Sequence, residues 1–442
     1  MQSATDLKPI SKKERINSVD TIRGVALLGI LLMNIVGFGL YRAYFDPTNS
    51  GGATGWDFKV WWINSMLFEG TMRGMFSMLF GAGIVLFTSR SEENSQGVSV
   101  TDAYFRRILW LLLFGVIHAY LLLWYGEILY PYALIGLIAF SFRHWKPKHL
   151  IIGTVVLCTV LTALNTKDYF QTKQISDAAS TATLKKSNGD SLTKDETQAI
   201  SGWDEIVGSK KATPAGFAEA KEKLSKGYFS IVWFRATLSQ FMETTIMYRV
   251  FFWDIFAMML LGMAFLKNGI LKAARSTKYY IVMMLAGYAV GIVTNYWETS
   301  YIVNHNFEIL SFAFTDITHE LGRLPTTIGH VGLIMLFIKS GVLPFLQRSL
   351  AAVGQMAFTN YITQTIICNT IFLGFGFGMF GKLHRYELYY IVFGIWIFQL
   401  ITSPIWLKYF RFGPLEWAWR SLTYWKKQPF KKIVESPVLV NK

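Results

Sequence analysis

The segment VDTIRGVALLGILLMN, residues 19–34, is strongly apolar, yet it carries an acid and a base near its start and ends on an amide. With the residues up to 43 it is long enough to cross a hydrocarbon core of about 30 Å, which takes about 20 helical residues. Similar runs recur along the 442-residue chain, of which 52% is hydrophobic and only 16% is charged. Soluble domains carry about 25% charged residues, so the sequence predicts an all-α polytopic membrane protein.

The apolar runs predict ten transmembrane helices. They cover residues 21–43, 71–89, 107–124, 127–143, 149–165, 249–267, 278–297, 326–339, 350–375 and 387–409. Two further segments, 56–70 and 307–323, mix aromatic and polar residues and are expected to lie along the membrane surface. The runs do not alternate with a period of two, which argues against a β-barrel.

The basic residues predict the orientation of the chain. Its formal net charge is +15, and Lys and Arg gather at the N-terminus, at 142–149, 267–278 and 339–348, and in the C-terminal tail. Because basic connections stay on the cytoplasmic side, both termini are expected in the cytoplasm. The connection 381–387, with three basic groups, is the exception. Topology and anionic lipid account for this charge, so membrane lipids are expected partners and nucleic acid is not.

The chain is expected to divide into four parts. Residues 1–165 and 249–411 each hold five predicted spans, and 412–442 form a basic cytoplasmic tail. Residues 166–248 are rich in Lys, Thr, Ser, Ala and Asp and are expected to form a polar extracytoplasmic insertion, since long loops cross the membrane regardless of charge. Two cysteines in separate apolar runs and no Cys/His cluster argue against disulfides and a metal site.

Polar residues inside the first span form one stripe. An ionisable group at the middle of a span costs at least about 2.5–3.5 kcal/mol on insertion scales, so it needs a partner, a cavity or a function. Asp20 and Arg23 are three residues apart and can pair on one helix face. Asn34 lies eleven residues after Arg23, about 16 Å further along the same face. An ordinary membrane-interface pair and a binding stripe both explain this pattern.

His118 is the histidine placed deepest in the first five predicted spans. Arg107 precedes it by eleven residues on the same helix face, at the cytoplasmic end. Imidazole is the usual general base near neutral pH, and Glu127 in the next turn is placed to orient it or to bind an acceptor. A histidine that only hydrogen-bonds a neighbouring helix is the alternative.

Glu69 and Arg73 are four residues apart at the start of the second span, a favourable spacing for an ion pair. A structural pair and a binding role are both open for them. Asp254, His330, Asn360, Tyr361 and Gln364 are more typical of polar contacts between packed helices. The sequence contains no P-loop, GxSxG or HExxH motif.

Six blocks carry a family resemblance. They are RINSVDTIRGVALLGILLMNI (15–35), FEGTMRGMFSMLFGAG (68–83), GVIHAYLLLWYGEILYPYALIGL (115–137), MLLGMAFLKNGI (259–270), VGQMAFTNYITQTII (353–367) and FGPLEWAWRSLTYW (412–425). In this order they resemble the YeiB-type family of bacterial cell-membrane proteins, whose C-terminal half is a domain of unknown function. That family is grouped with transmembrane acyltransferases, among them heparan-α-glucosaminide acetyltransferase and the acyltransferase-3 enzymes.

The resemblance implies transfer of an acyl group from a cytoplasmic acyl-CoA to a hydroxyl or amine of a small-molecule, glycan or lipid acceptor, and it is consistent with a homodimer. Acyltransferase-3 proteins carry an Arg followed eleven positions later by a His in the first span. Arg23 matches that Arg, but Asn34 stands where the His is expected. Asn is not a general base at neutral pH, so we assign that role to His118.

The predicted roles follow from these assignments. His118, Asn34 and Glu127 are the expected catalytic residues. The expected donor-binding residues are Arg23, Asp20, Arg107, Arg73 and Glu69. A transporter or lipid flippase is the first alternative, since mid-membrane polar groups suit transport equally well. A non-catalytic membrane scaffold or sensor is the second.

Overall fold

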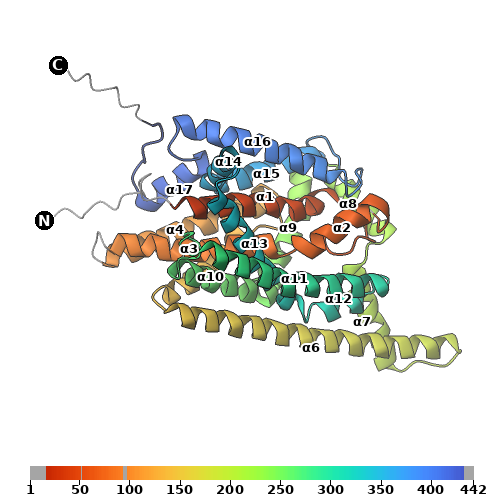
Figure 1. Ribbon diagram of the computed structural model, residues 1–442. Helices are drawn as coiled ribbons and strands as arrows, with labels where there is room; N and C mark the ends of the chain where they lie inside the picture. Colours follow the sequence, from red (N-terminus) through yellow and green to blue (C-terminus); the bar gives the residue numbers. More distant parts are fainter. Residues whose placement is uncertain (1–15, 51, 93–96, 433–442) are drawn as a thin grey trace, which may run out of the picture.

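The computed structural model describes residues 16–50, 52–92 and 97–432, which form a helical bundle (Figure 1). The helices are α1 (Asn17–Gly39), α2 (Gly55–Leu67), α3 (Thr71–Glu92), α4 (Gly97–Val116), α5 (Leu129–Ala139), α6 (Pro147–Ser187), α7 (Lys194–Lys210), α8 (Pro214–Leu224), α9 (Tyr228–Phe241), α10 (Phe252–Lys267), α11 (Thr277–Asn304), α12 (Ile309–Thr315), α13 (His319–Ser340), α14 (Pro344–Gln355), α15 (Ala357–Phe372), α16 (Leu388–Tyr409) and α17 (Pro414–Tyr424). Two π-helical segments, Ile117–Leu121 and Met242–Phe251, and a 3₁₀ turn, Phe140–Phe142, complete them. Among the described residues, Phe410 and Lys431 form a single isolated β-bridge and no strand occurs.

Seven helical stretches in the described chain are long and apolar enough to cross a membrane. They are Asn17–Gly39, Gly55–Ser89, Pro147–Ser187, Tyr228–Lys267, Thr277–Asn304, His319–Ser340 and Leu388–Tyr409. The prediction of an all-α membrane protein is therefore confirmed by length and composition. Most side chains of α1 are buried by its neighbours, so the segment 19–34 lies in a central helix of the bundle.

Three predicted spans take a different form. The segment expected to span at 107–124 is α4 followed by the π-helical turn Ile117–Leu121, and α4 starts ten residues earlier than expected. The next helix, α5, has 11 residues, about 16 Å, which is half of the hydrocarbon thickness. The segment 350–375 is divided into α14 and α15, which meet at Met356. Broken helices of this kind occur at membrane depth where neighbouring protein covers the free backbone groups.

Close helix crossings explain some of the glycines. A Cβ on Gly24 of α1 would lie 2.0 Å from the carbonyl oxygen of Leu350 on α14, and one on Gly354 would lie 1.9 Å from the oxygen of Asp20. The two glycines let α1 and α14 pack with their backbones in contact. Small residues at helix interfaces permit such packing in membranes, where lipid leaves little hydrophobic drive for association.

The segment 166–248, predicted as a polar insertion, is helical. It comprises the second half of the 41-residue α6, then α7 and α8, then α9 and the π-helical segment that leads into α10. The stretch Tyr228–Lys267 is continuous and qualifies as a membrane-spanning helix. The sixth predicted span, 249–267, is thus the second half of a longer helix. The expected surface helices 56–70 and 307–323 correspond to α2 and to α12 with the start of α13.

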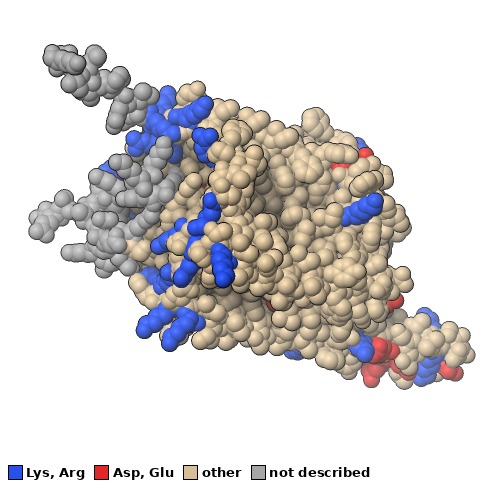
Figure 2. Space-filling view, viewed as in Figure 1, with Lys and Arg blue, Asp and Glu red and all other residues tan. Residues whose placement is uncertain are grey.

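Charge is distributed unevenly over the bundle. Figure 2 shows Lys and Arg gathered where α1 begins and α17 lies, while the middle of this face has almost no charge. Exposed Lys272, Arg275, Lys278 and Arg348 belong to this end, which we call the basic end. The opposite end carries α2, α7, α8 and α12 (Figure 1). A basic end, an apolar middle and a polar opposite end suit a chain in a bilayer.

Candidate functional site

The connection between α4 and α5 is buried inside the bundle. The π-helical turn Ile117–Leu121 ends α4, and Leu123 then adopts a positive φ of 59°. The carboxylate of Glu127 accepts hydrogen bonds from the backbone N–H groups of Leu129 and Tyr130, the latter at 2.8 Å. It therefore caps the N-terminus of α5, where free N–H groups need acceptors. π-Turns inside helices frequently mark functional sites.

His118 lies at the centre of this connection and has no exposed surface. Its Nε2 is 2.8 Å from the hydroxyl of Thr365 on α15, and its Nδ1 is 3.7 Å from Oε1 of Glu127. The ring also meets the edge of Tyr361, with 4.9 Å between ring centroids. The structure thus places an acid, an imidazole and a hydroxyl in sequence, the order that activates oxygen nucleophiles in acyl transfer.

Several buried polar atoms around His118 lack a hydrogen-bond partner. They are His118 Nδ1, Trp124 Nε1, Tyr361 OH and Asn369 Oδ1. Tyr361, Thr365 and Asn369 lie four residues apart and share one face of α15. Most buried polar groups in proteins are paired, so a group of unpaired ones indicates a site that binds something polar or performs chemistry. The name His118 cluster is used below for a group of six residues: His118, Trp124, Glu127, Tyr361, Thr365 and Asn369.

Helix α1 packs against the His118 cluster. Phe38 stacks on Trp124 with 3.8 Å between ring centroids, and the Tyr125 hydroxyl donates to the carbonyl of Gly37 at 3.2 Å. Asn34, which is partly buried, lies one helical turn before these two α1 residues. The structure therefore places the predicted catalytic residues Asn34, His118 and Glu127 in one region of the bundle.

Asp20 and Arg23 lie nearer the basic end. Arg23 Nη1 is 2.8 Å from Oδ1 of Asp20 and 3.5 Å from the carbonyl oxygen of Gly354 on α14. The predicted i, i+3 pair is present, and it also links α1 to α14. Arg107 has aromatic neighbours instead: its guanidinium lies 3.9 Å from the ring centroid of Trp419 on α17. Both arginines are therefore positioned on the side of the bundle that carries the basic surface.

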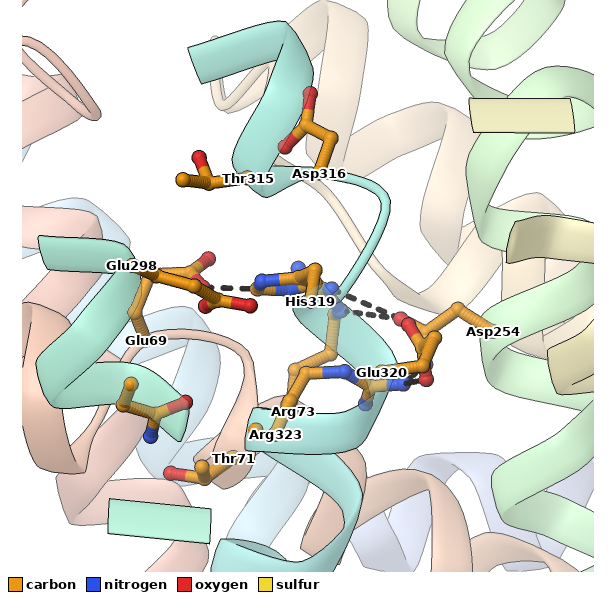
Figure 3. Close-up of polar contacts among 12 residues, drawn as sticks. Glu69, Thr71, Arg73, Asp254, Glu298, Thr315, Asp316, His319, Glu320 and Arg323 are labelled. Carbon is orange, nitrogen blue, oxygen red and sulfur yellow. Dashed lines mark hydrogen bonds and ion pairs between the residues drawn. The ribbon is translucent and has the colours of Figure 1, made fainter. Parts of the chain in front are cut away.

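A second polar region, the ion-pair network, joins α3, α10 and α13 (Figure 3). Nε and Nη2 of Arg73 lie 3.0 and 2.8 Å from Oδ2 of Asp254. Nη2 of Arg323 lies 2.7 Å from Oδ1 of Asp254 and also pairs with Glu320. Arg73 was expected beside Glu69, but its closest partner is Asp254. A two-nitrogen contact to a buried carboxylate is stronger than a surface i, i+4 pair.

Glu69 instead faces His319, the first residue of α13. Its Oε2 is 3.4 Å from Nε2 of His319 (Figure 3). Glu298 accepts a hydrogen bond from the Thr318 hydroxyl at 2.6 Å. Asp316 lies in the turn before α13 and lines a pocket of about 280 Å³ beside α6 and α7.

Sequence reasoning did not identify several of these residues. Thr365, Glu320 and Arg323 were not singled out, although TQT in α15 and HELGR in α13 place polar side chains in helices at membrane depth. Among the described residues, no group of His, Cys, Asp or Glu is arranged to hold a metal ion.

Comparison with known proteins gives a consistent result. The model of a family described as "Protein of unknown function (DUF418)" matches residues 265–426. "Uncharacterized protein YxaH" of Bacillus subtilis (strain 168) is 31% identical, with 97% of this chain and 99% of that protein covered. "Uncharacterized protein YeiB" of Escherichia coli (strain K12) is 30% identical, with 93% and 96% covered. No solved structure matches this chain.

Proposed function

The chain belongs to the YeiB-type family of membrane proteins, and we propose that it is an integral-membrane acyltransferase of the cell membrane. The reaction moves an acyl group from a cytoplasmic acyl-CoA to a hydroxyl or amine of an acceptor at or across the membrane. The observation that carries this proposal is the contact of His118 with Thr365 on one ring nitrogen and the approach of Glu127 to the other.

In the proposed mechanism His118 Nε2 accepts the proton of the attacking acceptor group. The new C–O or C–N bond forms at the acyl carbon as the C–S bond breaks, and the proton passes to the leaving thiol. Glu127 stabilises the imidazolium, and Asn34 donates a hydrogen bond to the developing oxyanion. Thr365 holds the ring in position until the acceptor arrives.

The donor enters from the basic end in this proposal. CoA carries several phosphate charges, and Arg23 and Arg107 lie on that side of the bundle, with Asp20 holding Arg23 in place. The topology belongs to the proposal as well: ten membrane segments, counting α4, α5 and the α14–α15 pair, with both termini in the cytoplasm. The distribution of Lys and Arg supports this orientation.

The test is turnover of acyl-CoA by the purified full-length protein. Removing a general base lowers a rate by about 10²–10⁴-fold, and we expect such a loss of thiol release in the His118→Ala variant. The His149→Ala variant, which changes an exposed histidine at the start of α6, is the matched control. Wild-type rates in the His118→Ala variant contradict the role given to His118, and no turnover by the wild-type protein with any acyl-CoA contradicts the function.

The ion-pair network favours a second candidate, a transporter. Buried ionisable groups in membrane helices commonly line ion or proton pathways, and Arg73, Asp254, Glu320 and Arg323 form such a group. Substrate movement that depends on a membrane gradient, abolished by Asp254→Asn and unaffected by His118→Ala, would favour transport over acyl transfer.

A further inference from the structure

Arg235 is a buried cation without a carboxylate partner. It lies on α9 and is 4% exposed, and its Nε has no hydrogen-bond partner. Its guanidinium lies over the ring of Tyr125, 4.8 Å from the centroid. Within the described chain, Tyr125 is the side chain with which it interacts, both electrostatically and by a hydrogen bond. A buried charge with no counter-ion is costly, by several kcal/mol in proteins.

Three other arginines of the bundle have compensating groups. Arg73 and Arg323 share the carboxylate of Asp254, and Arg385 donates to the carbonyl of Ala43 near two aspartates. Two acids near the connection that holds His118 are used elsewhere. Glu127 caps α5, and Glu243 accepts a hydrogen bond from the hydroxyl of Tyr120 at 2.9 Å. Among the described residues, Arg235 thus forms no ion pair with a carboxylate.

Arg235 is placed beside the His118 cluster. On the same face of α9, Ile231 is four residues before it and packs in a cluster with Leu123, while Ser239 four residues after it contacts the carbonyl of Ala119 at 3.4 Å. These two contacts lie on either side of Arg235, at the connection that holds His118. Tyr125, over which the guanidinium lies, also contacts α1 at Gly37.

We infer that Arg235 binds the phosphate of an anionic acceptor, held so that its hydroxyl reaches His118. A planar guanidinium presents its N–H groups in a fixed fork, which suits two-point contact with phosphate. The phosphate comes from an anionic lipid headgroup or from a soluble phosphate ester. This inference rests on the proposed function for the acceptor's role, whereas the anion site is measurable without turnover.

The experiment measures phospholipid binding to the purified full-length chain, without acyl donor, by native mass spectrometry. Phosphatidylglycerol is the anionic probe, and phosphatidylcholine is the zwitterionic reference. We expect the Arg235→Gln variant to lose at least about tenfold in affinity for phosphatidylglycerol, since a buried charge-assisted contact is removed. Arg235→Lys keeps the positive charge but lacks the planar guanidinium, so we expect a smaller loss of affinity for phosphatidylglycerol. Arg249→Gln is the matched control, because Arg249 follows on the same continuous helix and pairs with Asp168.

A stability measurement separates this role from a structural one. If an external anion is the partner of Arg235, then Arg235→Gln leaves the unfolding temperature in neutral detergent unchanged or raises it, and abolishes the increase caused by phosphatidylglycerol. Displacement of the lipid by glycerol phosphate supports a site for soluble phosphate esters. Absence of displacement supports a site for a lipid headgroup. Equal phosphatidylglycerol affinity of Arg235→Gln and wild type, or equal binding of the two lipids, overturns the inference.

Discussion

The His118 cluster and the ion-pair network are both buried polar regions, but their charges are paired to different degrees. In the network, Asp254 holds two arginines, and Glu320 adds a second carboxylate to Arg323. In the His118 cluster, four polar atoms have no partner, and Arg235 beside it has no counter-ion. A network of paired charges stabilises one arrangement of helices. An unsaturated cluster keeps binding capacity for a substrate at some cost in stability.

The largest predicted effect is on the stability of the network. Replacing Asp254 by Ala leaves Arg73 and Arg323 buried with one carboxylate fewer, and breaking a buried pair in this way costs about 3–5 kcal/mol. We expect a corresponding loss in the free energy of unfolding, measured by denaturation of the purified protein in detergent. Asp316→Ala, which removes an exposed carboxylate from the same region, is the control. An Asp254→Ala protein as stable as wild type would remove the distinction between the two regions.

A Glu127 variant tests the His118 cluster in the same way. The Glu127→Gln variant retains one side-chain oxygen to cap α5 but has no charge to stabilise an imidazolium at His118. We expect kcat to fall by about 10²–10⁴-fold, the range for impaired acid–base catalysis, with the KM for acyl-CoA unchanged. Initial rates over a range of donor concentrations provide the measurement. A rise in KM at constant kcat would place Glu127 in donor binding instead.

The sequence was a good guide to the helices and a partial guide to the site. Apolar runs of about 20 residues locate helices because exposed backbone in lipid is too costly. His118 and Glu127 could be linked because one short turn separates them. The partners of His118 and Asp254 could not be predicted from the sequence. Thr365 lies 247 residues from His118, and Arg73 lies 181 residues from Asp254. Such pairs are set by how the helices pack.

Arg235 shows a second limit of sequence reasoning. The stretch 166–248 is polar on average. This average composition gave no sign of the helical turns of α9 that face the bundle. Ile231, Arg235 and Ser239 recur every four residues and are all buried. This periodicity was available in the sequence, but a polar surrounding composition favoured a surface insertion over a packed helix.

Thr365 gives a smaller predicted effect. Thr365→Val keeps the shape of the side chain but removes the hydroxyl at 2.8 Å from His118 Nε2. Leaving a buried imidazole nitrogen unpaired costs about 1–3 kcal/mol, so we expect a reduction in unfolding free energy within this range and a slower reaction. Thr363→Val is the matched control on α15, because that hydroxyl bonds only its own helix backbone, at Thr359. Identical behaviour of the two variants would mean that the Thr365 contact does not hold the ring.

The smallest effect is expected where α17 holds the cluster from the basic end. The carboxylate of Glu416 accepts hydrogen bonds from the backbone N–H groups of Phe358 and Thr359 at 2.7 and 3.1 Å, and from the Thr359 hydroxyl at 2.6 Å. It thereby caps α15, the helix that carries Thr365. On the same short helix, Trp419 donates to the carbonyl of Arg107 on α4 at 2.8 Å. Helix α17 thus holds the start of α15 and the middle of α4, the two helices that meet at His118.

The pH dependence of stability tests this cap. Burial raises the pKa of the Glu416 carboxyl above its usual value of 4.5, against the opposing effect of the hydrogen bonds from Thr359. The folded state then binds the proton more tightly than the unfolded state, so this contribution to stability is complete below the usual pKa and is lost as pH rises through the raised one. Glu416→Gln stays neutral at every pH. We therefore expect its unfolding temperature, relative to wild type, to rise with pH above about 4.5, whereas the exposed control Glu308→Gln shows no such trend. A difference that is constant with pH would show that the cap acts through hydrogen bonds alone, and that the ordering of α15 at Thr365 does not depend on the charge of α17.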